Sequence, residues 1–538
     1  MSRLARTWQL LRHHKPSQFA WRLYRRVRTR LPMPGVPDVS VSEDLDGFRE
    51  LNRLKAEAAQ PIDLSGDAVT LTFLNQPREF KDGIDWDVPD APHLWRFHLH
   101  YHEFLWSVPP EDRLSVMEDW RRRCPPRRGD AWHPFTVSRR LPVWLATLAA
   151  VADPPAELVR SAAHQTAWLR ADLERDLGGN HLLENAKALA MAGLFFDRKD
   201  WRDEADRLLN RELSRQLLPF GEHYERSPMY HALMLEAMRD AQTCGWPRTG
   251  EMHDFGLEPR AMTGHLLRVL HPDGRIPLFA DAAFDQTPDE FALIRRDHLF
   301  AAASADDLDD PVGARSIGDY WTYRTRRRTF LIFDAGPLAA DELPAHAHCD
   351  LLGIELSVEG RRWVTDSGVF DYEDSAMRAY CRSTAAHSVP QVEGEEHADM
   401  WGKFRVGRRG RIAATDLSDG PRAEATARLP SGATMTRRID VDGETVRVAD
   451  SAAGTGGRAL FSRLHLHPDV GVDRAGEMTL VLRRGDVTRT LTCDEAVAVE
   501  TSWYCPEFNV RRERPVLVAR SADGEVTWTL SDPVREGV

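Results

Sequence analysis

The chain has 538 residues, of which 42% are hydrophobic, enough to bury the cores of two or three domains. Its formal net charge of -12 argues against nonspecific adhesion of the whole molecule to nucleic acid or to an anionic membrane. Six cysteines without a CxxC pair predict neither a disulfide scaffold nor a thiolate zinc site, and no apolar run approaches the roughly 18–20 residues that span a bilayer.

The first forty residues form a basic segment. Its opening thirty residues, MSRLARTWQLLRHHKPSQFAWRLYRRVRTR, contain many arginines and no acidic residue. This pattern is typical of a basic amphipathic helix. It predicts either a membrane-surface or partner-docking element, or a solvated helix that lies on an acidic body. The segment has no uninterrupted apolar core, so a secretory signal peptide is not predicted.

The apolar pattern changes period once along the chain. In residues 41–320 apolar residues recur every three or four positions, as in RRLPVWLATLAAVA, which predicts many short helices packed pairwise. In residues 325–538 short alternating runs are broken by Gly and Asp-Gly, and Asp442-Gly443 and Asp523-Gly524 are predicted hairpin turns. We therefore expect a helical domain followed by an antiparallel β-sandwich.

The stretch GGNHLLENAKALAMAGLFF, residues 178–196, predicts a buried helix with Asn180 as N-cap and His181 in its first turn. Such a helix end directs amide donors and two polar side chains at one spot, which suits a carboxylate. The alternative is a capped core helix in which Glu184 and Asn185 satisfy their neighbours.

The stretch GEHYERSPMYHALMLEAMRD predicts a second helix that begins at the N-cap and N1 pair Ser227-Pro228. Tyr230 and His231 then lie in its first turn, where the helix field favours a phenolate. Tyr230 is a candidate general acid or base, and the alternative is a core tyrosine.

Metal ligands and proton carriers gather further along the chain. They are His346, His348, Asp350, Asp366 and His387. The first three would share one face of a regular strand, and two or three imidazoles with a carboxylate form a zinc-like ligand set. If Glu359-Gly360 forms a two-residue turn, however, Asp366 lies opposite roughly residue 353, so a metal site requires the histidine segment to curl back before the strand begins.

These segments together resemble the heparinase II/III family of polysaccharide lyases, whose relatives include alginate lyases. HLWRFHLHYHEFLW, GNHLLENAKAL, ERSPMYH and HPDGRIPLFAD resemble the family's toroid helices, and HAHCDLLGIEL, WVTDSGVFDY and RSTAAHSV resemble the start of its β domain. The resemblance spans most of the chain. It implies an incomplete α/α toroid followed by an antiparallel β-sandwich, without an organic cofactor.

The chemistry that the resemblance implies is β-elimination at a uronic acid of an anionic polysaccharide. By motif match, Asn180 and His181 neutralise the uronate carboxylate, and Tyr230 and His346 are the catalytic tyrosine and histidine. In a syn elimination the tyrosine can do both proton transfers, whereas in an anti elimination His346 serves as base.

The resemblance also implies a structural zinc ion held by His348, Asp366 and His387, as a brace for the loops of the β domain. Arg139 and Arg382 are candidate contacts for substrate carboxylates, and each is equally typical of a surface salt bridge. The resemblance places the protein in the periplasm, whereas the unpredicted signal peptide favours the cytoplasm.

Two other functions fit parts of the sequence. One is a catalytically silent polysaccharide-binding or export protein that keeps the fold. The other is a metal-dependent hydrolase built on His-X-His-X-Asp, although the next residue is Leu351, where such enzymes carry another histidine. The sequence indicates neither the sugar, nor endo or exo cleavage, nor the oligomeric state. Heparin is not the expected substrate, because the basic N-terminal segment resembles relatives associated with bacterial polysaccharide gene clusters.

Overall fold

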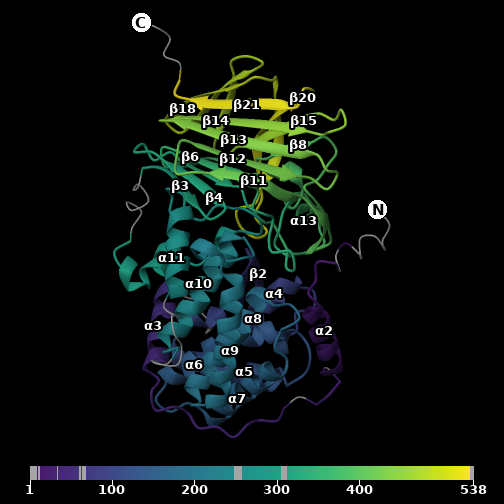
Figure 1. Cartoon of the computed structure of the whole chain (residues 1–538). Coiled ribbons are helices and arrows are strands. Elements are labelled where there is room, and N and C mark those ends of the chain that lie inside the picture. Colours follow the sequence, from purple (N-terminus) through teal and green to yellow (C-terminus); the bar gives the residue numbers. More distant parts are fainter. Residues whose placement is uncertain are drawn as a thin grey trace. The chain divides into compact units, whose positions relative to one another are not determined.

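The computed structural model describes residues 9, 12–28, 30–32, 34–59, 62, 68–247, 257–303 and 312–533 (Figure 1). The chain divides into two compact units. The strand-rich unit comprises Met1–His13, Leu218–Leu233 and Arg260–Val538, and the helical unit comprises His14–Leu217 and Met234–Pro259. Within the described ranges no helix has the length and apolarity needed to cross a membrane.

The helical unit contains the segments whose period predicts helices. They are α2 (Pro16–Arg28), α3 (Asp46–Ala58), α4 (His93–Tyr101), α5 (Pro110–Arg123), α6 (Pro134–Ala150), α7 (Ala156–Ala171), α8 (Gly179–Phe195), α9 (Lys199–Gln216) and most of α10 (Pro228–Thr243), with the short 3-10 helices η1 (Glu103–Ser107) and η2 (Asp130–Trp132). Helix α6 packs against α3, α4, α7 and α8, and α8 packs against α9. Every residue of α8 except His181 is buried, as the apolar sequence of this helix predicts.

One hairpin interrupts the helical region and is absent from the sequence-based expectation. It pairs β1 (Val69–Phe73) with β2 (Gln76–Phe80). Leu74 and Asn75 form its two-residue turn, with φ of 54° and 58°. Two-residue hairpin turns usually contain Asn-Gly or Asp-Gly, which can be recognised in a sequence. Leucine rarely adopts the left-handed backbone conformation, so Leu74-Asn75 does not predict a turn.

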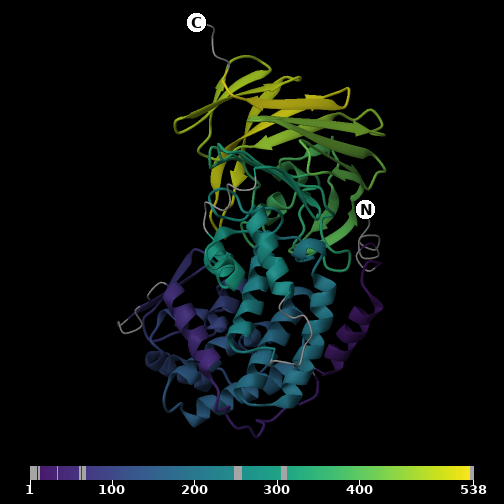
Figure 2. The same ribbon diagram turned by 60° about the vertical axis from the view of Figure 1, so that its left-hand side comes forward.

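The strand-rich unit is built from antiparallel sheets, whose layers are visible in Figure 2. One sheet contains β3 (Gly313–Ile317), β4 (Tyr320–Arg324), β5 (Phe330–Asp334), β6 (Ile354–Val358) and β7 (Arg361–Val364), in that order. A four-stranded sheet has the order β19 (Val497–Tyr504), β20 (Arg512–Ser521), β15 (Leu460–His465) and β8 (Pro390–Val392).

The largest sheet of this unit has eight strands. Their order is β11 (Arg411–Leu417), β12 (Arg422–Arg428), β13 (Thr434–Asp442), β14 (Thr445–Ala453), β21 (Glu525–Ser531), β18 (Val487–Cys493), β17 (Thr479–Arg484) and β16 (Gly471–Arg474). A separate ribbon pairs β9 (Ala398–Trp401) with β10 (Arg405–Arg409). The unit also contains the helices α11 (Leu257–Val269, from Arg260 onward), α12 (Glu290–Arg295) and α13 (Ala376–Cys381), and the 3-10 helices η3 (Pro219–Gly221), η4 (Phe284–Gln286), η5 (His298–Phe300) and η7 (Thr384–Ala386).

A single apolar core joins the three larger sheets. It includes Trp321 and Leu331 of the five-stranded sheet, Met435 of the eight-stranded sheet and Leu460 and Leu517 of the four-stranded sheet, all fully buried. Strands such as β13 alternate buried and half-buried residues, as expected where one face of a sheet covers a core. The predicted antiparallel β-sandwich is therefore confirmed.

The two predicted Asp-Gly turns differ in outcome. Strands β13 and β14 do form a hairpin, in which Asp442 pairs with Thr445. The prediction of a second hairpin at Asp523-Gly524 is wrong, because β20 pairs with β15 and β19, whereas β21 pairs with β14 and β18. This turn carries the chain from the four-stranded to the eight-stranded sheet.

The two compact units have other boundaries than the predicted helical domain, residues 41–320, and the predicted β-sandwich domain, residues 325–538. Residues 218–233 and 260–300, although largely helical, belong to the strand-rich unit. A second core cluster gives the reason, since Val269 at the end of α11 packs with Phe279, Tyr320, Phe330 and Ile332.

A buried ion pair fixes the sandwich to the segments described below. The Arg437 guanidinium contacts both oxygens of Asp450 at 2.7 Å, and both side chains are fully buried. Arg437 also donates to the carbonyls of Leu352, at 2.8 Å, and Ser388. The hydroxyl of Ser462 donates to Asp450 at 2.6 Å.

We predict that Asp450→Ala lowers the free energy of unfolding by about 3–5 kcal/mol, because Arg437 is left as a buried charge without its counter-ion. Urea denaturation followed by tryptophan fluorescence measures this change. The matched control is Asp440→Ala on the neighbouring strand β13, which removes the exposed pair with Arg422 and costs less than about 1 kcal/mol. Equal effects of the two substitutions would contradict the role of the buried pair.

Candidate functional site

Residues 341–353, the histidine loop, connect β5 to β6 without regular structure. His346, His348 and Asp350 therefore do not share one face of a strand, and the alternative that a metal site requires, a segment that curls back before the strand, is the one found. The chain turns where the Ala347 amide donates to the Pro344 carbonyl at 3.2 Å, and Leu352 has a φ of 66°. The loop thus curls before β6 begins.

The predicted turn at Glu359-Gly360 is confirmed, because both residues have positive φ and Val358 pairs with Arg361. Asp366 therefore follows the end of β7, as the register argument requires. It is the curl of the histidine loop that brings His348 close to Asp366.

Arg382 supports the histidine loop from α13. Its side chain is buried and donates at 3.3 Å to the carbonyls of Ala347, Gly402 and Lys403. The Arg382 carbonyl in turn accepts from the Cys349 amide at 3.1 Å. These contacts fit a role in positioning the loop better than a direct contact with a substrate carboxylate.

Asp281 is the residue around which the site is arranged. Its carboxylate accepts from His346 Nδ1 at 2.9 Å and from His348 Nε2 at 2.9 Å, and it is paired with both terminal nitrogens of Arg378. Burial by itself raises the pKa of Asp281, but the Arg378 guanidinium and the two histidine hydrogen bonds hold it well below its usual range. Asp281 is therefore a buried anion that orients two imidazoles.

Tyr230 lies directly against His346. The sequence predicts that α10 begins at Pro228, and it does; the Tyr230 amide donates to Ser227 Oγ at 3.3 Å. The rings of Tyr230 and His346 stack with centroids 3.8 Å apart, and the phenol oxygens of Tyr230 and Tyr372 are 3.2 Å apart. On its other side, His346 Nε2 is 3.3 Å from a carboxylate oxygen of Glu225.

The sequence predicts that the field of the helix favours the phenolate form of Tyr230, whereas its surroundings favour the phenol. Burial raises the pKa of Tyr230 above its usual value, and the charges of Asp281 and Glu225 act in the same direction. The phenol is therefore held in its protonated form. His231, one residue on, is a core residue whose Nε2 donates to the Met262 carbonyl at 3.0 Å.

His348, Asp366 and His387 form a buried cluster in which one ligand atom of each residue lies within 4.8 Å of the others. His387 Nδ1 donates to Asp366 at 2.8 Å. His348 Nδ1 and His387 Nε2 are buried without a hydrogen-bond partner among the described residues. Burial lowers the pKa of His348 to about 4, so its ring is neutral at pH 7. Burial by itself lowers the pKa of His387, but the Asp366 carboxylate raises it above its usual value. Two imidazole nitrogens and a carboxylate fit the ligand preferences of zinc, which binds in place of a proton.

The neighbours of His348 in sequence do not belong to this cluster. A carboxylate oxygen of Asp350 accepts from the Ala280 amide at 3.1 Å, and burial raises the pKa of Asp350 to about 7. The Cys349 thiol points to the Ala398 carbonyl at 3.4 Å. A supporting role for Asp350, and none for Cys349 as a ligand, fits these contacts.

Asn180 and His181 belong to the helical unit. The N-cap of α8 is Gly178, and Asn180 is the second helical residue, so the prediction of Asn180 as N-cap is wrong. The reason is that Gly178 and Gly179 both adopt positive φ, which turns the chain into the helix two residues earlier. Asn180 is buried, while His181 is half-buried and its ring centroid lies 4.4 Å from that of Phe135, with the two rings tilted by 40°.

Glu174 anchors this helix start. Its carboxylate lies 3.0 Å from His181 Nδ1 and accepts from Asn185 Nδ2 at 3.0 Å. Burial alone raises the pKa of Glu174, but His181, His133 and Asn185 together lower it to about 2. His181 thus has its Nδ1 held by a buried anion, in the same way as His346.

Arg139 is engaged in an ion-pair network of the helical unit. It contacts Glu184 at 2.8 Å and Glu103 at 2.6 Å, and Lys187 pairs with the other oxygen of Glu184. This network agrees with the alternative given for this helix, in which Glu184 pairs with neighbouring side chains, here those of Arg139 and Lys187.

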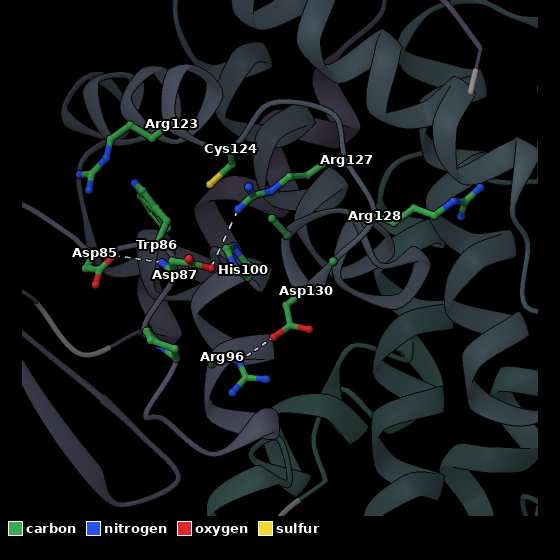
Figure 3. Close-up of a pocket in the computed structure, with 13 residues that line it drawn as sticks. Asp85, Trp86, Asp87, Arg96, His100, Arg123, Cys124, Arg127, Arg128 and Asp130 are labelled. Carbon is green, nitrogen blue, oxygen red and sulfur yellow. Dashed lines mark hydrogen bonds and ion pairs between the residues drawn. The ribbon is translucent and has the colours of Figure 1, made fainter. Parts of the chain in front are cut away.

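A cavity of about 530 Å³ lies elsewhere in the helical unit, and none of the predicted site residues lines it (Figure 3). Its arginines are accompanied by acidic residues. Arg96 contacts Asp130 at 2.6 Å and Arg127 approaches Asp87 at 4.0 Å, while Arg128 extends away from the cavity (Figure 3). The balanced charges give no basis for assigning it a ligand.

Comparisons with known proteins agree on one family. Residues 81–296 match the family model of the heparinase II/III N-terminus, and residues 311–529 match that of the heparinase II/III-like C-terminal domain. A heparin-sulfate lyase of Pedobacter heparinus is 24% identical over 358 residues, which are 58% of this chain and 53% of that protein. The alignment therefore spans about half the length of this relative.

Solved structures share the fold across 96% of this chain. A crystal structure of heparinase III has a TM-score of 0.70 at 15% identity and is covered over 89% of its length. The heparan sulfate lyase of Pedobacter heparinus has a TM-score of 0.59 at 20% identity, with 88% of its length covered. A chondroitin AC lyase of Streptomyces coelicolor A3 has a TM-score of 0.53 at 12% identity, with 83% of its length covered. The expected α/α toroid followed by a β-sandwich is thus confirmed, and the chain belongs to the heparinase II/III family.

Proposed function

We propose that this protein is a polysaccharide lyase that cleaves a uronic-acid-containing anionic polysaccharide by β-elimination and leaves a 4,5-unsaturated uronate at the new end. The observation that carries this proposal is the stacking of Tyr230 on His346, with His346 Nδ1 held by the buried Asp281 carboxylate. Relatives named as heparin-sulfate, heparan sulfate and chondroitin lyases support the reaction class.

The reaction needs two proton transfers and no water. A base removes the proton from C5, the C5–H electron pair forms the C4=C5 double bond, and the C4–O4 bond breaks. The departing O4 then takes a proton from an acid. The C5 proton is barely acidic while the neighbouring carboxylate is charged, so donors that neutralise this carboxylate lower the barrier.

The residues of the strand-rich unit have the properties that these transfers require. Because Asp281 accepts from Nδ1 of His346, the neutral ring keeps its lone pair on Nε2, which is the atom we assign as base in an anti elimination. Glu225, 3.3 Å from Nε2, stabilises the imidazolium that forms. Tyr230 holds its proton and is the acid toward O4 in an anti elimination. In the alternative syn elimination Tyr230 performs both transfers, which requires the phenol to lose this proton first, take the proton from C5 and then pass it to O4.

The substrate contacts in this proposal rest on the family resemblance. Asn180 and His181 are assigned to the uronate carboxylate, while Arg139 and Arg382 are weaker candidates because their charges or donors already have protein partners. A periplasmic location is proposed on the same resemblance.

The proposal includes a structural zinc ion held by His348, Asp366 and His387. The support is the pair of buried imidazole nitrogens without hydrogen-bond partners among the described residues, beside a carboxylate. When bound, zinc cross-links the histidine loop to the segments that follow β7 and η7. Asp281 is the outer carboxylate that fixes the orientation of the His348 ring.

We predict that Tyr230→Phe abolishes turnover and leaves the fold intact, because only the hydroxyl that carries the proton is removed. Absorbance of the unsaturated uronate during incubation with a panel of uronic-acid polymers measures the reaction. Tyr323→Phe, which removes a hydroxyl on β4 that donates to the Gly443 carbonyl, is the control with normal turnover. Near-normal turnover of Tyr230→Phe would reject the assignment.

We predict that His348→Ala releases zinc and lowers the free energy of unfolding by roughly a few kcal/mol, since the metal stabilises only the folded chain. Metal analysis and thermal unfolding give the two readings. His231→Ala, which also removes a buried imidazole, loses stability without losing zinc. Wild-type protein purified without zinc, and unable to take it up, would overturn the metal site.

We predict that Asp281→Asn reduces turnover by about 10²–10⁴-fold, because the amide no longer stabilises the imidazolium or fixes its tautomer. The same variant binds zinc more weakly by about 10–100-fold, through His348. Glu290→Gln, which alters a buried carboxylate of the same unit that pairs with Arg275, retains both properties. An Asp281 variant that loses zinc but keeps turnover would separate the metal site from catalysis and contradict this scheme.

A further inference from the structure

Helix α2 lies on the helical unit through its polar edge. Arg25 contacts Asp172 at 3.2 Å and Asp176 at 2.8 Å, and Arg175 lies over the ring of Trp21 at 5.1 Å. The contacts with Asp172 and Asp176 agree with the interpretation of the basic segment as a helix that lies on an acidic body. The side of the helix that faces the protein is thus defined by an ion-pair cluster and one aromatic contact.

The opposite side of α2 is apolar and exposed. Phe19, Leu23, Tyr24 and Val27 are 40–65% exposed, and Leu31 beyond the helix end is 55% exposed. Three- and four-residue spacing places these side chains in one stripe. No described residue of α2 is fully buried. An amphipathic helix normally turns such a stripe toward a core, whereas the described residues of this chain leave the stripe exposed.

Charge around the stripe is strongly positive. Residues 1–37 contain eight arginines and one lysine without an acidic residue, whereas the rest of the chain holds 62 basic and 83 acidic residues, a formal charge of -21. Arg22 and Arg26 are exposed on the flank of the apolar stripe. Their long side chains can reach an anionic layer while the stripe is buried beside them.

A groove of about 730 Å³ runs along the same flank of α2. Phe19, Leu23, Arg22 and Arg26 line it from the helix, together with residues of 128–134. The groove therefore combines apolar and guanidinium groups at the edge of the exposed stripe.

We propose that α2 is an interfacial anchor that binds the surface of an anionic phospholipid membrane, with the stripe of Phe19, Leu23, Tyr24 and Val27 in the acyl boundary and Arg22 and Arg26 at the headgroups. A single ridge of four or five side chains falls well short of the about 800 Å² per partner of a stable protein interface. It is sufficient for a helix that lies in the plane of a lipid interface. The net negative charge of the remainder confines attachment to this element.

The test is sedimentation of the full chain with vesicles of phosphatidylcholine alone or with about 30% phosphatidylglycerol. We expect binding to the anionic vesicles only, and its loss in about 0.5 M salt, which screens the arginines. Leu23→Gln/Val27→Gln should weaken binding at least about tenfold, because the transfer of two apolar side chains from water into the membrane no longer stabilises the bound state. Arg22→Gln/Arg26→Gln should weaken binding about tenfold or more and remove the preference for phosphatidylglycerol.

The matched control is Leu299→Gln/Val312→Gln, which replaces the same residue types at 60% and 44% exposure away from α2 and should bind like the wild type. Circular dichroism establishes that each variant is folded. Wild-type protein that stays in the supernatant with both vesicle types overturns the proposal. So does a dimer that dissociates when Leu23 and Val27 are replaced, because the stripe would then be an interface between two copies.

Discussion

The site depends on one buried carboxylate, that of Asp281. A fully buried anion is costly unless it is paired and hydrogen-bonded, and here Arg378 supplies the charge while His346 and His348 supply the hydrogen bonds. The same carboxylate therefore fixes the tautomer of the proposed base and orients a proposed metal ligand. Tyr230 is held nearby because Ser227, which caps its helix, donates to the Asp281 carbonyl at 2.6 Å. In the proposed function, proton transfer and zinc binding are coupled through this residue.

The residue types of the site could be predicted, but not their organisation. Tyr230, His346, His348, Asp366 and His387 carry recognisable motifs, and the structure brings the last three into one cluster. The sequence pattern predicts no role for Asp281 or Arg378, because their contact joins residues 97 positions apart and no local period encodes such a distance. The RIPLFAD stretch was itself a signal, since an aspartate that ends a buried apolar run needs a buried partner.

The fold shows a similar division. Periods of 3.6 and 2 predict the helical region and the sandwich, because both reflect which face of an element is buried. Turns are less predictable. Leu74-Asn75 closes a hairpin without glycine, and Asp523-Gly524, a good hairpin sequence, connects two different sheets. Strand pairing depends on burial of alternating side chains, such as Val526 and Trp528, against residues distant in sequence. The sequence of a turn carries no information about this burial.

The most direct test of the proposed reaction is cleavage of a uronate polymer in water labelled with oxygen-18, followed by mass spectrometry of the new chain ends. An elimination through Tyr230 and His346 consumes no water, so the new non-reducing end is lighter than a hydrolytic end by one water, and the fragments carry no label from bond cleavage. New non-reducing ends that all have the mass of a hydrolytic end, with none lighter by one water, would identify hydrolysis and contradict the account.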